Sequence, residues 1–332
     1  MGQVVGIWGR ATVIWPGLVL AGLVAMAAQF LADHYGAPVM LMALLLGAPF
    51  QFLAEEPRTA EGIGFAAKSI LRLGVILLGA RVSLTMVQDI GLGFVVWMVM
   101  AVAATIGLSL VCARLAGRDR LFGYLTGGAV AICGASAAMA ISAVLPDRES
   151  SDRDLAFTVI SVTVLSTLAM IFYPVIVATL GLSDHQAGLF LGGTIHDVAQ
   201  VVGAGFSVSD QAGEVSTVVK LMRVTLLAPV VLIGALILRR SAPVGIARPP
   251  LLPGFVIGFL GLVALNSFGL IPDMVTEVFG AVSRACLVTA VAAVGIRTSL
   301  ARLRAVGVAP VALMLGQTVF IAVFVLLGVV LL

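Results

Sequence analysis

The sequence predicts an all-α protein that crosses a membrane many times. Hydrophobic residues make up 61% of the 332 residues, charged residues make up 11%, and the mean hydropathy is +1.18. Soluble domains carry about 25% charged residues, so this chain has too little charge to cover a water-facing surface. Apolar stretches of about 20 residues, the length of a membrane-spanning helix, recur along the whole chain. Together these observations exclude an ordinary soluble fold.

Eleven apolar windows predict eleven transmembrane helices. They cover roughly residues 13–32, 38–53, 63–80, 92–113, 121–145, 155–180, 187–206, 216–238, 251–270, 277–296 and 307–331. The second window is short, and the fifth, seventh and tenth are rich in small residues, so the boundaries of these four are the least defined. The first window also resembles a signal peptide, because Arg10 precedes it and Ala25-Met26-Ala27 resembles a cleavage site. Its length favours a retained helix.

Basic loop residues predict a cytoplasmic N-terminus, because cytoplasmic loops retain lysine and arginine. Among the arginines, the outer loops then hold only Arg81, Arg148 and Arg153, and they also hold acidic residues that include Asp154. The inner loops hold eleven arginines, which are Arg10, Arg58, Arg114, Arg118, Arg120, Arg239, Arg240, Arg248, Arg297, Arg302 and Arg304. Because the basic residues are scattered, the net charge of +3 does not indicate nucleic-acid binding. We expect a multi-pass protein of the bacterial inner membrane with a periplasmic C-terminus.

Short sequence motifs that recur 152 residues apart indicate that the chain contains two similar halves. This offset separates Lys68 from Lys220, and it aligns Gly128-Ala129-Val130 with Gly280-Ala281-Val282. The alignment of the two halves stays open, because another pair of short motifs matches at a different offset. We predict an extra helix in residues 1–36 and five-helix repeats in residues 37–181 and 182–332. Since five is odd, the two copies would enter the membrane in opposite directions, which is typical of secondary transporters.

Two pairs of basic residues lie within apolar stretches. They are Lys68 with Arg72 and Lys220 with Arg223. A cation in the middle of a bilayer costs about 2.5 to 3.5 kcal/mol, so these side chains should face protein, water or an anionic cargo. Alternatively, they lie near the ends of helices, where their long stems reach the lipid headgroups.

A glycine-rich segment, Gly127 to Ala137, interrupts the fifth window. Its glycines permit an unwound middle, and the positive amino end of the second half-helix can then hold an anion. We expect the donors to be Ser136 and the amides around Gly134 and Ala135, with Cys133 beside them. The alternative is a small-residue face for close helix packing.

Arg284 is a fifth unusual cation, in the tenth window. Under the 152-residue offset it aligns with Ile132, beside the glycine-rich segment of the other copy. A guanidinium group suits bidentate contact with an oxyanion, so Arg284 is a further candidate ligand. An interfacial position near the outer end of the tenth window is the alternative.

The seventh window carries a polar cluster of Thr194, His196, Asp197 and Gln200 between glycine pairs. His196 and Gln200 are four residues apart and share one face of a helix. Because imidazole and carboxylate groups exchange protons and bind cations, His196 and Asp197 predict a site for a coupling ion, H⁺ or Na⁺, or part of the anion site. The alternative is a structural histidine with satisfied hydrogen bonds. The cysteines show no disulfide or metal-binding pattern, and we expect no cofactor.

These motifs together resemble the YeiH-type family, which is also called UPF0324 and is named for sulfate export. The resemblance covers the chain from about residue 38 onward and rests on Lys68 to Gly79, Cys133 to Ala137, Thr194 to Val202, Lys220 to Arg223 and Asn266-Ser267. It implies an inner-membrane carrier of small sulfur oxyanions, related to the bile-acid/sodium symporter superfamily, with a panel domain and a core domain that contains crossed broken helices. Such proteins commonly have Glu after the histidine, whereas this chain has the shorter Asp197.

The sequence therefore predicts a secondary transporter that moves a small anion, such as sulfate, sulfite or a sulfonate, by alternating access. Its site would lie near mid-membrane among breaks in the fifth and tenth windows. The candidate substrate ligands are Lys68, Arg72, Cys133, Gly134, Ala135, Ser136, Thr194, His196, Gln200, Lys220, Arg223 and Arg284. A passive anion channel and a membrane-embedded enzyme are the alternatives, and no catalytic motif favours the enzyme. The expected partners are the anion and the lipid bilayer, and a homodimer is left open.

Overall fold

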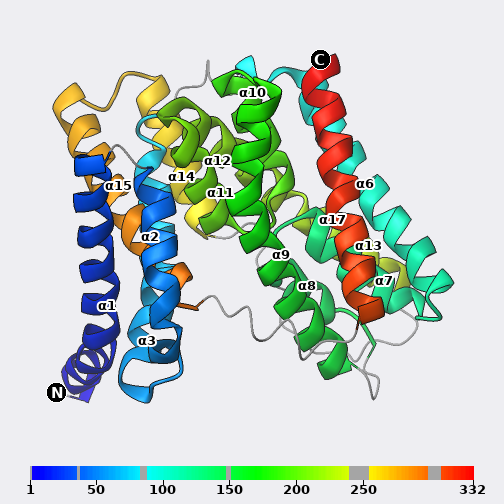
Figure 1. Ribbon diagram of the computed structural model, residues 1–332, viewed down its shortest axis with the longest axis horizontal. Helices are drawn as coiled ribbons and strands as arrows, with labels where there is room; N and C mark the ends of the chain where they lie inside the picture. The colour runs from blue at the N-terminus through cyan, green and yellow to red at the C-terminus, as the bar shows by residue number, and fades with distance from the viewer. Residues whose placement is uncertain (1, 36–37, 83–87, 147–150, 239–253, 298–307) are drawn as a thin grey trace. The chain divides into compact units, whose positions relative to one another are not determined.

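The computed structural model describes residues 2–35, 38–82, 88–146, 151–238, 254–297 and 308–332 (Figure 1). Within these residues the secondary structure is helical, and no strand is present. The chain divides into two compact units. Unit 1 comprises residues 1–87, 202–214 and 254–299, and unit 2 comprises residues 88–201, 215–253 and 300–332. Each unit takes segments from both sides of the repeat boundary predicted after residue 181, so the units are not the predicted repeats, which stay a prediction.

Unit 1 is built from helices that pack closely through glycines. Its elements are α1 (Gly2–Tyr35), α2 (Val39–Gly47), the 3₁₀ helix η1 (Ala48–Ala54), α3 (Pro57–Phe65), the π-helical segment η2 (Ala66–Ile70), α4 (Leu71–Leu78), α14 (Gly254–Ser267) and α15 (Asp273–Arg297). Side chains larger than hydrogen at Gly47 or Gly295 would meet the backbone of the facing helix. Small residues allow such close approach between membrane helices, so α2 packs directly on α15.

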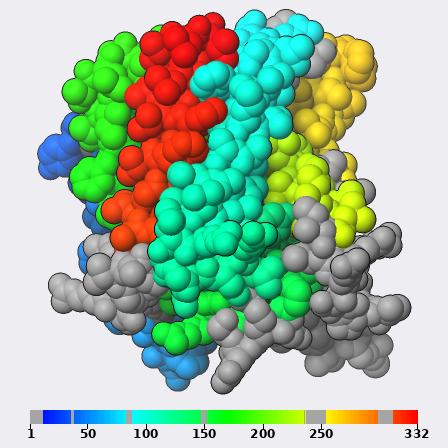
Figure 2. All heavy atoms as spheres, turned by 90° about the vertical axis from the view of Figure 1, so that its right-hand side faces the viewer, coloured from blue at the N-terminus to red at the C-terminus, as the bar shows by residue number. Residues whose placement is uncertain are grey.

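Unit 2 contains the other helices and both of the helix interruptions discussed below. Its elements are α6 (Gly91–Leu115), α7 (Arg120–Ala131), α8 (Ala135–Ser142), α9 (Ser151–Leu180), α10 (Asp184–Thr194), α13 (Leu227–Leu238) and α17 (Val308–Leu331). Figure 2 shows α6 and α17 side by side, where the Trp97 and Phe324 rings stack with centroids 4.9 Å apart. Two helices pass between the units: α11 (Val198–Val208) begins in unit 2 and ends in unit 1, and α12 (Asp210–Thr225) begins in unit 1 and continues in unit 2.

The all-α membrane fold agrees with the prediction. Six helical segments of the described chain are long and apolar enough to cross a membrane: Thr12–Tyr35, Gly91–Leu115, Arg153–Leu180, Asp210–Gly234, Asp273–Arg297 and Val311–Leu331. Every predicted window overlaps at least one described helix. The count of eleven crossings and the inverted repeat stay predictions, because the other windows hold shorter or interrupted helices.

The fifth window forms a hairpin of two short helices rather than one continuous helix. The Asp119 side chain caps the start of α7 by accepting a hydrogen bond from the Phe122 amide, at 2.8 Å, and α7 packs against α8. Just before α7, an Arg118 guanidinium nitrogen lies 3.3 Å from a carboxylate oxygen of Asp154 in the first turn of α9. The Phe122 and Phe157 rings lie 5.9 Å apart. The start of α7 and the start of α9 are therefore neighbours.

This contact corrects the predicted topology. The sequence placed Arg118 inside and Asp154 outside, but two residues in an ion pair cannot lie on opposite sides of a hydrocarbon layer about 30 Å thick. Arg153 is next to Asp154 in the chain, so its predicted side of the membrane changes in the same way. Arg148 lies outside the described residues. The α7 helix, with 12 residues, is about 18 Å long, so a hairpin built from α7 and α8 is little more than half as long as the hydrocarbon layer is thick.

The tenth window is not interrupted, and the prediction of a break there is wrong. Helix α15 runs without a gap from Asp273 to Arg297 (Figure 1). Gly280 lies inside this continuous helix, whereas in the fifth and seventh windows glycines lie next to cations that bond the carbonyls freed at the breaks. Arg284 belongs to unit 1 and Ile132 to unit 2, so the 152-residue register does not describe two matched breaks.

Candidate functional site

Unit 2 contains two interrupted helices. Helix α7 ends at Ala131 and α8 begins at Ala135, while α10 ends at Thr194 and α11 begins at Val198. Gly134 has φ +64° and ψ −128°, a conformation that residues with a side chain rarely adopt. A Cβ atom added to Gly134 would lie 3.6 Å from the Cβ of His196. The two breaks are therefore adjacent, and the first depends on a glycine.

Lys220, on α12, joins the two breaks. Its side chain is completely buried. The Nζ atom donates hydrogen bonds to the Ile132 carbonyl, at 2.7 Å, and to the Ile195 carbonyl, at 2.9 Å. Each acceptor is the first residue after a half-helix, so one ammonium group holds the carboxyl ends of α7 and α10 together.

Arg223, one turn after Lys220, is also completely buried and extends this bridge. On the α7 side, Nε and Nη2 donate to the Ala131 carbonyl, at 3.1 and 2.7 Å, and Nη2 also donates to the Val130 carbonyl, at 3.1 Å. On the α10 side, Nη1 donates to the carbonyls of Gly192 and Ile195, both at 3.1 Å. A guanidinium group has five N–H bonds, and here the five contacts use them all.

These contacts explain how two cations can be buried at the breaks. The last carbonyls of a helix lack intrahelical partners, and the carboxyl end carries partial negative charge that favours a nearby cation. Lys220 and Arg223 satisfy both needs for α7 and α10. Their donors point at backbone, so their main effect is to fix the two interruptions in place.

The amino end of α8 is the accessible part of the first break. Ser136 is exposed and Ala135 is half-buried, whereas Cys133 and Gly134 are buried. Gly134 provides no side-chain cap for α8. The first amides of a helix have no intrahelical acceptor, so this end presents hydrogen-bond donors and partial positive charge.

The amino end of α11 differs, because it carries its own anion. A carboxylate oxygen of Asp197 accepts a hydrogen bond from the Ala199 amide, at 2.9 Å. The Asp197 amide donates to Ser166 Oγ on α9, at 3.0 Å. A capping carboxylate matches the positive end of a helix. Asp197 therefore acts as a cap in this conformation, while α8 has no equivalent carboxylate.

His196 is buried beside this cap and bonded to α17. Its Nε2 atom lies 3.1 Å from Thr318 Oγ1, and the Thr318 hydroxyl donates to the Met314 carbonyl, at 2.9 Å. Since the threonine proton is used in this way, His196 Nε2 is the donor to Thr318 Oγ1. Within the described residues, Nδ1 has no hydrogen-bond partner.

Two other predicted polar residues are also buried in this layer. The Gln200 side-chain amide donates to Thr167 Oγ1, at 2.7 Å, and its Oε1 atom has no partner within the described part of the chain. The Thr194 hydroxyl donates to the Phe190 carbonyl of its own helix, at 2.6 Å. Neither side chain reaches the accessible surface in this conformation.

Comparison with known proteins places this architecture in a family. The model of the family described as Conserved hypothetical protein 698 matches residues 16–314. The chain is 56% identical over 324 residues to the UPF0324 membrane protein TauZ of Paracoccus denitrificans, covering 96% of each chain. It is 58% identical over 316 residues to the UPF0324 membrane protein RB0971 of Rhizobium meliloti, covering 94% of this chain and 92% of that one.

The chain belongs to the UPF0324 family. A third relative, UPF0324 membrane protein CT0845 of Chlorobaculum tepidum, is 53% identical over 315 residues and matches 94% of this chain and 88% of its own. No solved structure matches. The family resemblance drawn from the sequence motifs is confirmed, and the relatives establish a membrane protein.

In this UPF0324 protein only two of the five predicted intramembrane cations lie at the breaks. Lys68 and Arg72 are exposed residues of unit 1, and the Arg72 guanidinium carbon lies 5.8 Å from the centre of the Phe255 ring. Arg284 is also exposed in unit 1 and lies 3.5 Å from Asp210. Burial therefore separates Lys220 and Arg223 from the others.

Three residues of the site were not predicted. Ser166 and Thr167 on α9 bond to the α11 break, and Thr318 on α17 bonds to His196. Polar residues inside apolar windows were the available signal, most clearly Gln317-Thr318 in the last window. Helical periodicity gives no information on which distant helix such a residue contacts.

Proposed function

We propose that this UPF0324 protein carries a small oxyanion across the bacterial inner membrane by alternating access. One observation carries the proposal: the amino end of α8 is accessible and Gly134 provides no side-chain cap, at the tip of a hairpin long enough to reach about half-way into a bilayer. Helix amino ends bind anions through their amides and their partial positive charge. Interrupted helices with such ends form substrate sites in secondary transporters.

The substrate would bind at α8 through the Ser136 hydroxyl and the amides around Ala135. Lys220 and Arg223 would act from behind the site, because they hold the backbone in its interrupted form and add positive charge in a medium of low dielectric constant. Bonds to the carbonyls occupy every N–H of Arg223, so the geometry favours a positioning role over the direct anion contact predicted from the sequence.

The substrate class follows from the chemistry and the family. Amide and hydroxyl donors suit the oxygens of a small anion. The resemblance to the YeiH-type family implies sulfur oxyanions, which carry such oxygens. We therefore propose sulfate, sulfite or a sulfonate as the cargo.

His196 and Asp197 are the proposed coupling residues. Asp197 holds the amino end of α11, and His196 has a ring nitrogen without a partner in the described chain. Proton or Na⁺ binding here would change the charge next to the first break, since Gly134 and His196 are adjacent. Rigid-body motion of one helix bundle against the other would then alternate access.

The decisive variant is Ser136→Asp. It places a carboxylate at the amino end of α8, as Asp197 does for α11, so we expect a stable protein whose own side chain excludes the substrate. Ser136→Asn is the matched neutral control of nearly equal size. Uptake of radiolabelled sulfate and sulfite into proteoliposomes should fall at least about tenfold for the aspartate variant relative to the asparagine variant.

Two results would contradict the proposal. One is full transport by the Ser136→Asp protein after normal insertion, and the other is no saturable transport of any of these anions by the parent protein at two pH values, with and without Na⁺. Counterflow separates a carrier from a passive channel, because only a carrier exchanges labelled anion against a gradient of unlabelled anion.

A further inference from the structure

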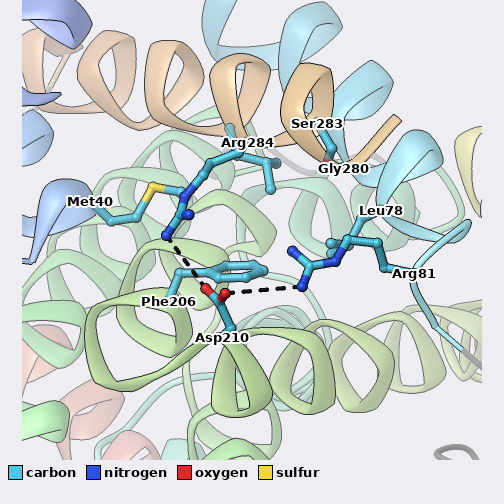
Figure 3. A pocket seen from close by; sticks show the side chains of 9 residues that line it. Met40, Leu78, Arg81, Phe206, Asp210, Gly280, Ser283 and Arg284 are labelled. Atoms are coloured by element: carbon cyan, nitrogen blue, oxygen red, sulfur yellow. Dashed lines mark hydrogen bonds and ion pairs between the residues drawn. The ribbon is translucent and has the colours of Figure 1, made fainter. Parts of the chain in front are cut away.

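Unit 1 contains two arginines that converge on one carboxylate (Figure 3). We infer that Arg81 and Arg284 form a second oxyanion site, and that the Asp210 carboxylate occupies it in this conformation as an internal substitute. The ligand would be a tetrahedral oxyanion, either free in solution or as the phosphate of a lipid headgroup. None of these residues belongs to the α8 site, so the inference stands independently of the proposed transport function.

Both guanidinium groups are held by the packing of α4 against α15. The Ser283 hydroxyl of α15 donates to the Gly74 carbonyl of α4, at 2.7 Å, in the buried contact between these helices. Arg81, just after α4, lies across Gly280 of α15, where an added Cβ would be 3.0 Å from the arginine Cδ. Arg284 follows one turn later on α15. The scaffold thus aims two cations at one place.

The distances show that Asp210 is a poor fit between them. Its carboxylate oxygens lie 3.5 Å from Arg284 Nη2 and 4.0 Å from Arg81 Nη2. Charge-assisted N–H···O bonds are usually about 2.7 to 2.9 Å long. Arg81 lies closer to Glu214, at 3.2 Å. One carboxylate with two oxygens does not satisfy both guanidinium groups at once, whereas an anion with three or four oxygens can.

Asp210 is also easy to displace. Its side chain is 51% exposed and that of Arg284 is 55% exposed, and exposed ion pairs contribute little free energy. Helix α12 does not depend on Asp210 for its cap, because Ser209 Oγ accepts from the Ala212 amide, at 3.0 Å, and the Ser209 carbonyl accepts from the Gly213 amide, also at 3.0 Å. The carboxylate can leave without unwinding the helix.

A shallow hollow lies at this position, and an anion gains room there only when the Asp210 carboxylate turns away. Its apolar lining includes Met40, Leu78, Phe206 and Leu287. With the Asp210 carboxylate turned away, Arg81, Arg284 and Glu214 leave one net positive charge. The hollow then combines a cationic rim with an apolar base, which suits a compact anion.

The test uses the full-length purified protein and the isosteric variant Asp210→Asn, which removes the internal carboxylate. Sulfate binding is titrated in detergent by calorimetry, and retained phosphatidylglycerol is measured by mass spectrometry after reconstitution into nanodiscs. Each measurement is repeated in the Ser136→Asp background, which keeps the α8 site out of the signal. Asp273→Asn is the matched control, because it removes the same charge from an exposed position of unit 1.

We expect Asp210→Asn to tighten sulfate binding about tenfold, because a like charge is removed from beside the anion. Arg284→Gln added to that variant should abolish the gain, and Asp273→Asn should have no effect. More retained phosphatidylglycerol without tighter sulfate binding would support the site and identify the lipid as its ligand. The inference is overturned if neither ligand responds to Asp210→Asn, or if Arg284→Gln leaves the gain intact.

Discussion

Hydrogen bonds to backbone carbonyls stabilise the buried side chains of Lys220 and Arg223. Together they donate seven hydrogen bonds to carbonyl groups at the ends of α7 and α10. A buried charge is tolerated only when its hydrogen bonds are satisfied. Lys68 and Arg72 also lie in an apolar stretch, but their side chains are exposed. They therefore do not need hydrogen bonds from the protein to offset burial of their charge.

Arg223→Lys should destabilise the protein, although it keeps the charge. A lysine has three N–H donors at one point, so it cannot replace the five hydrogen bonds that Arg223 donates to the carbonyls of Val130, Ala131, Gly192 and Ile195. Each buried carbonyl left without a partner costs about 1 to 3 kcal/mol, so we expect a melting temperature several degrees lower in detergent, followed by size-exclusion chromatography after heating. Arg72→Lys, at an exposed site, is the control and should melt like the parent. Equal melting of the two variants would show that the carbonyl contacts are unimportant.

At the scale of elements, the breaks arise where glycines coincide with partners for the freed backbone. The break between α7 and α8 was predicted from the glycine-rich segment, and the structure shows that Lys220 and Arg223 bond the carbonyls at the end of α7. The break between α10 and α11 was not predicted as such, although its polar cluster was recognised. The expected break in α15 is absent: the helix is continuous through Gly280, where the glycine accommodates the Arg81 stem.

Gly134→Ala tests the first break. The backbone conformation at Gly134, with φ +64°, costs a residue with a Cβ about 1 to 3 kcal/mol, so we expect lower stability and a large loss of transport. Gly107→Ala in α6 is the matched control, since no atom lies near the added methyl group and φ is ordinary. Alanine favours helix there by up to about 1 kcal/mol. If Gly134→Ala behaves like Gly107→Ala, the unwound backbone is not needed.

For the whole molecule, the hairpin of α7 and α8 changes the predicted sidedness. With the start of α9 on the same side as Arg118, Arg153 joins the arginines assigned to the cytoplasm. If the α10–α11 segment also returns, the six arginines from Arg239 to Arg304 keep their predicted cytoplasmic side, whereas if it crossed fully these six would change sides and the cytoplasmic majority of arginines would be lost. The positive-inside rule therefore predicts that α10 and α11 also return to the side from which they enter.

Cysteine labelling tests this topology. In a protein without its native cysteines, Ala116→Cys and Arg153→Cys should react with a membrane-impermeant maleimide from the same side, because they flank the α7–α8 hairpin. Asp184→Cys, at the start of α10, should react from the other side, because α9 crosses between them. All three positions are exposed. Labelling of Ala116→Cys and Arg153→Cys from opposite sides would mean that α7 and α8 cross the membrane after all.

The sequence by itself determined the class of the protein, its family and most of its helices. Apolar stretches in a membrane must satisfy their backbone hydrogen bonds internally, so hydropathy alone predicts helices. Local glycines and polar clusters also identified residues 127–137 and 192–205 as unusual. Tertiary structure decided which cations are buried, which helices are interrupted and whether a segment crosses or returns. The physical reason is that an apolar sequence suits a segment that crosses the membrane and one that returns equally well. Which of the two forms depends on contacts between residues distant in the sequence, such as Arg118 with Asp154 and Arg223 with Gly192.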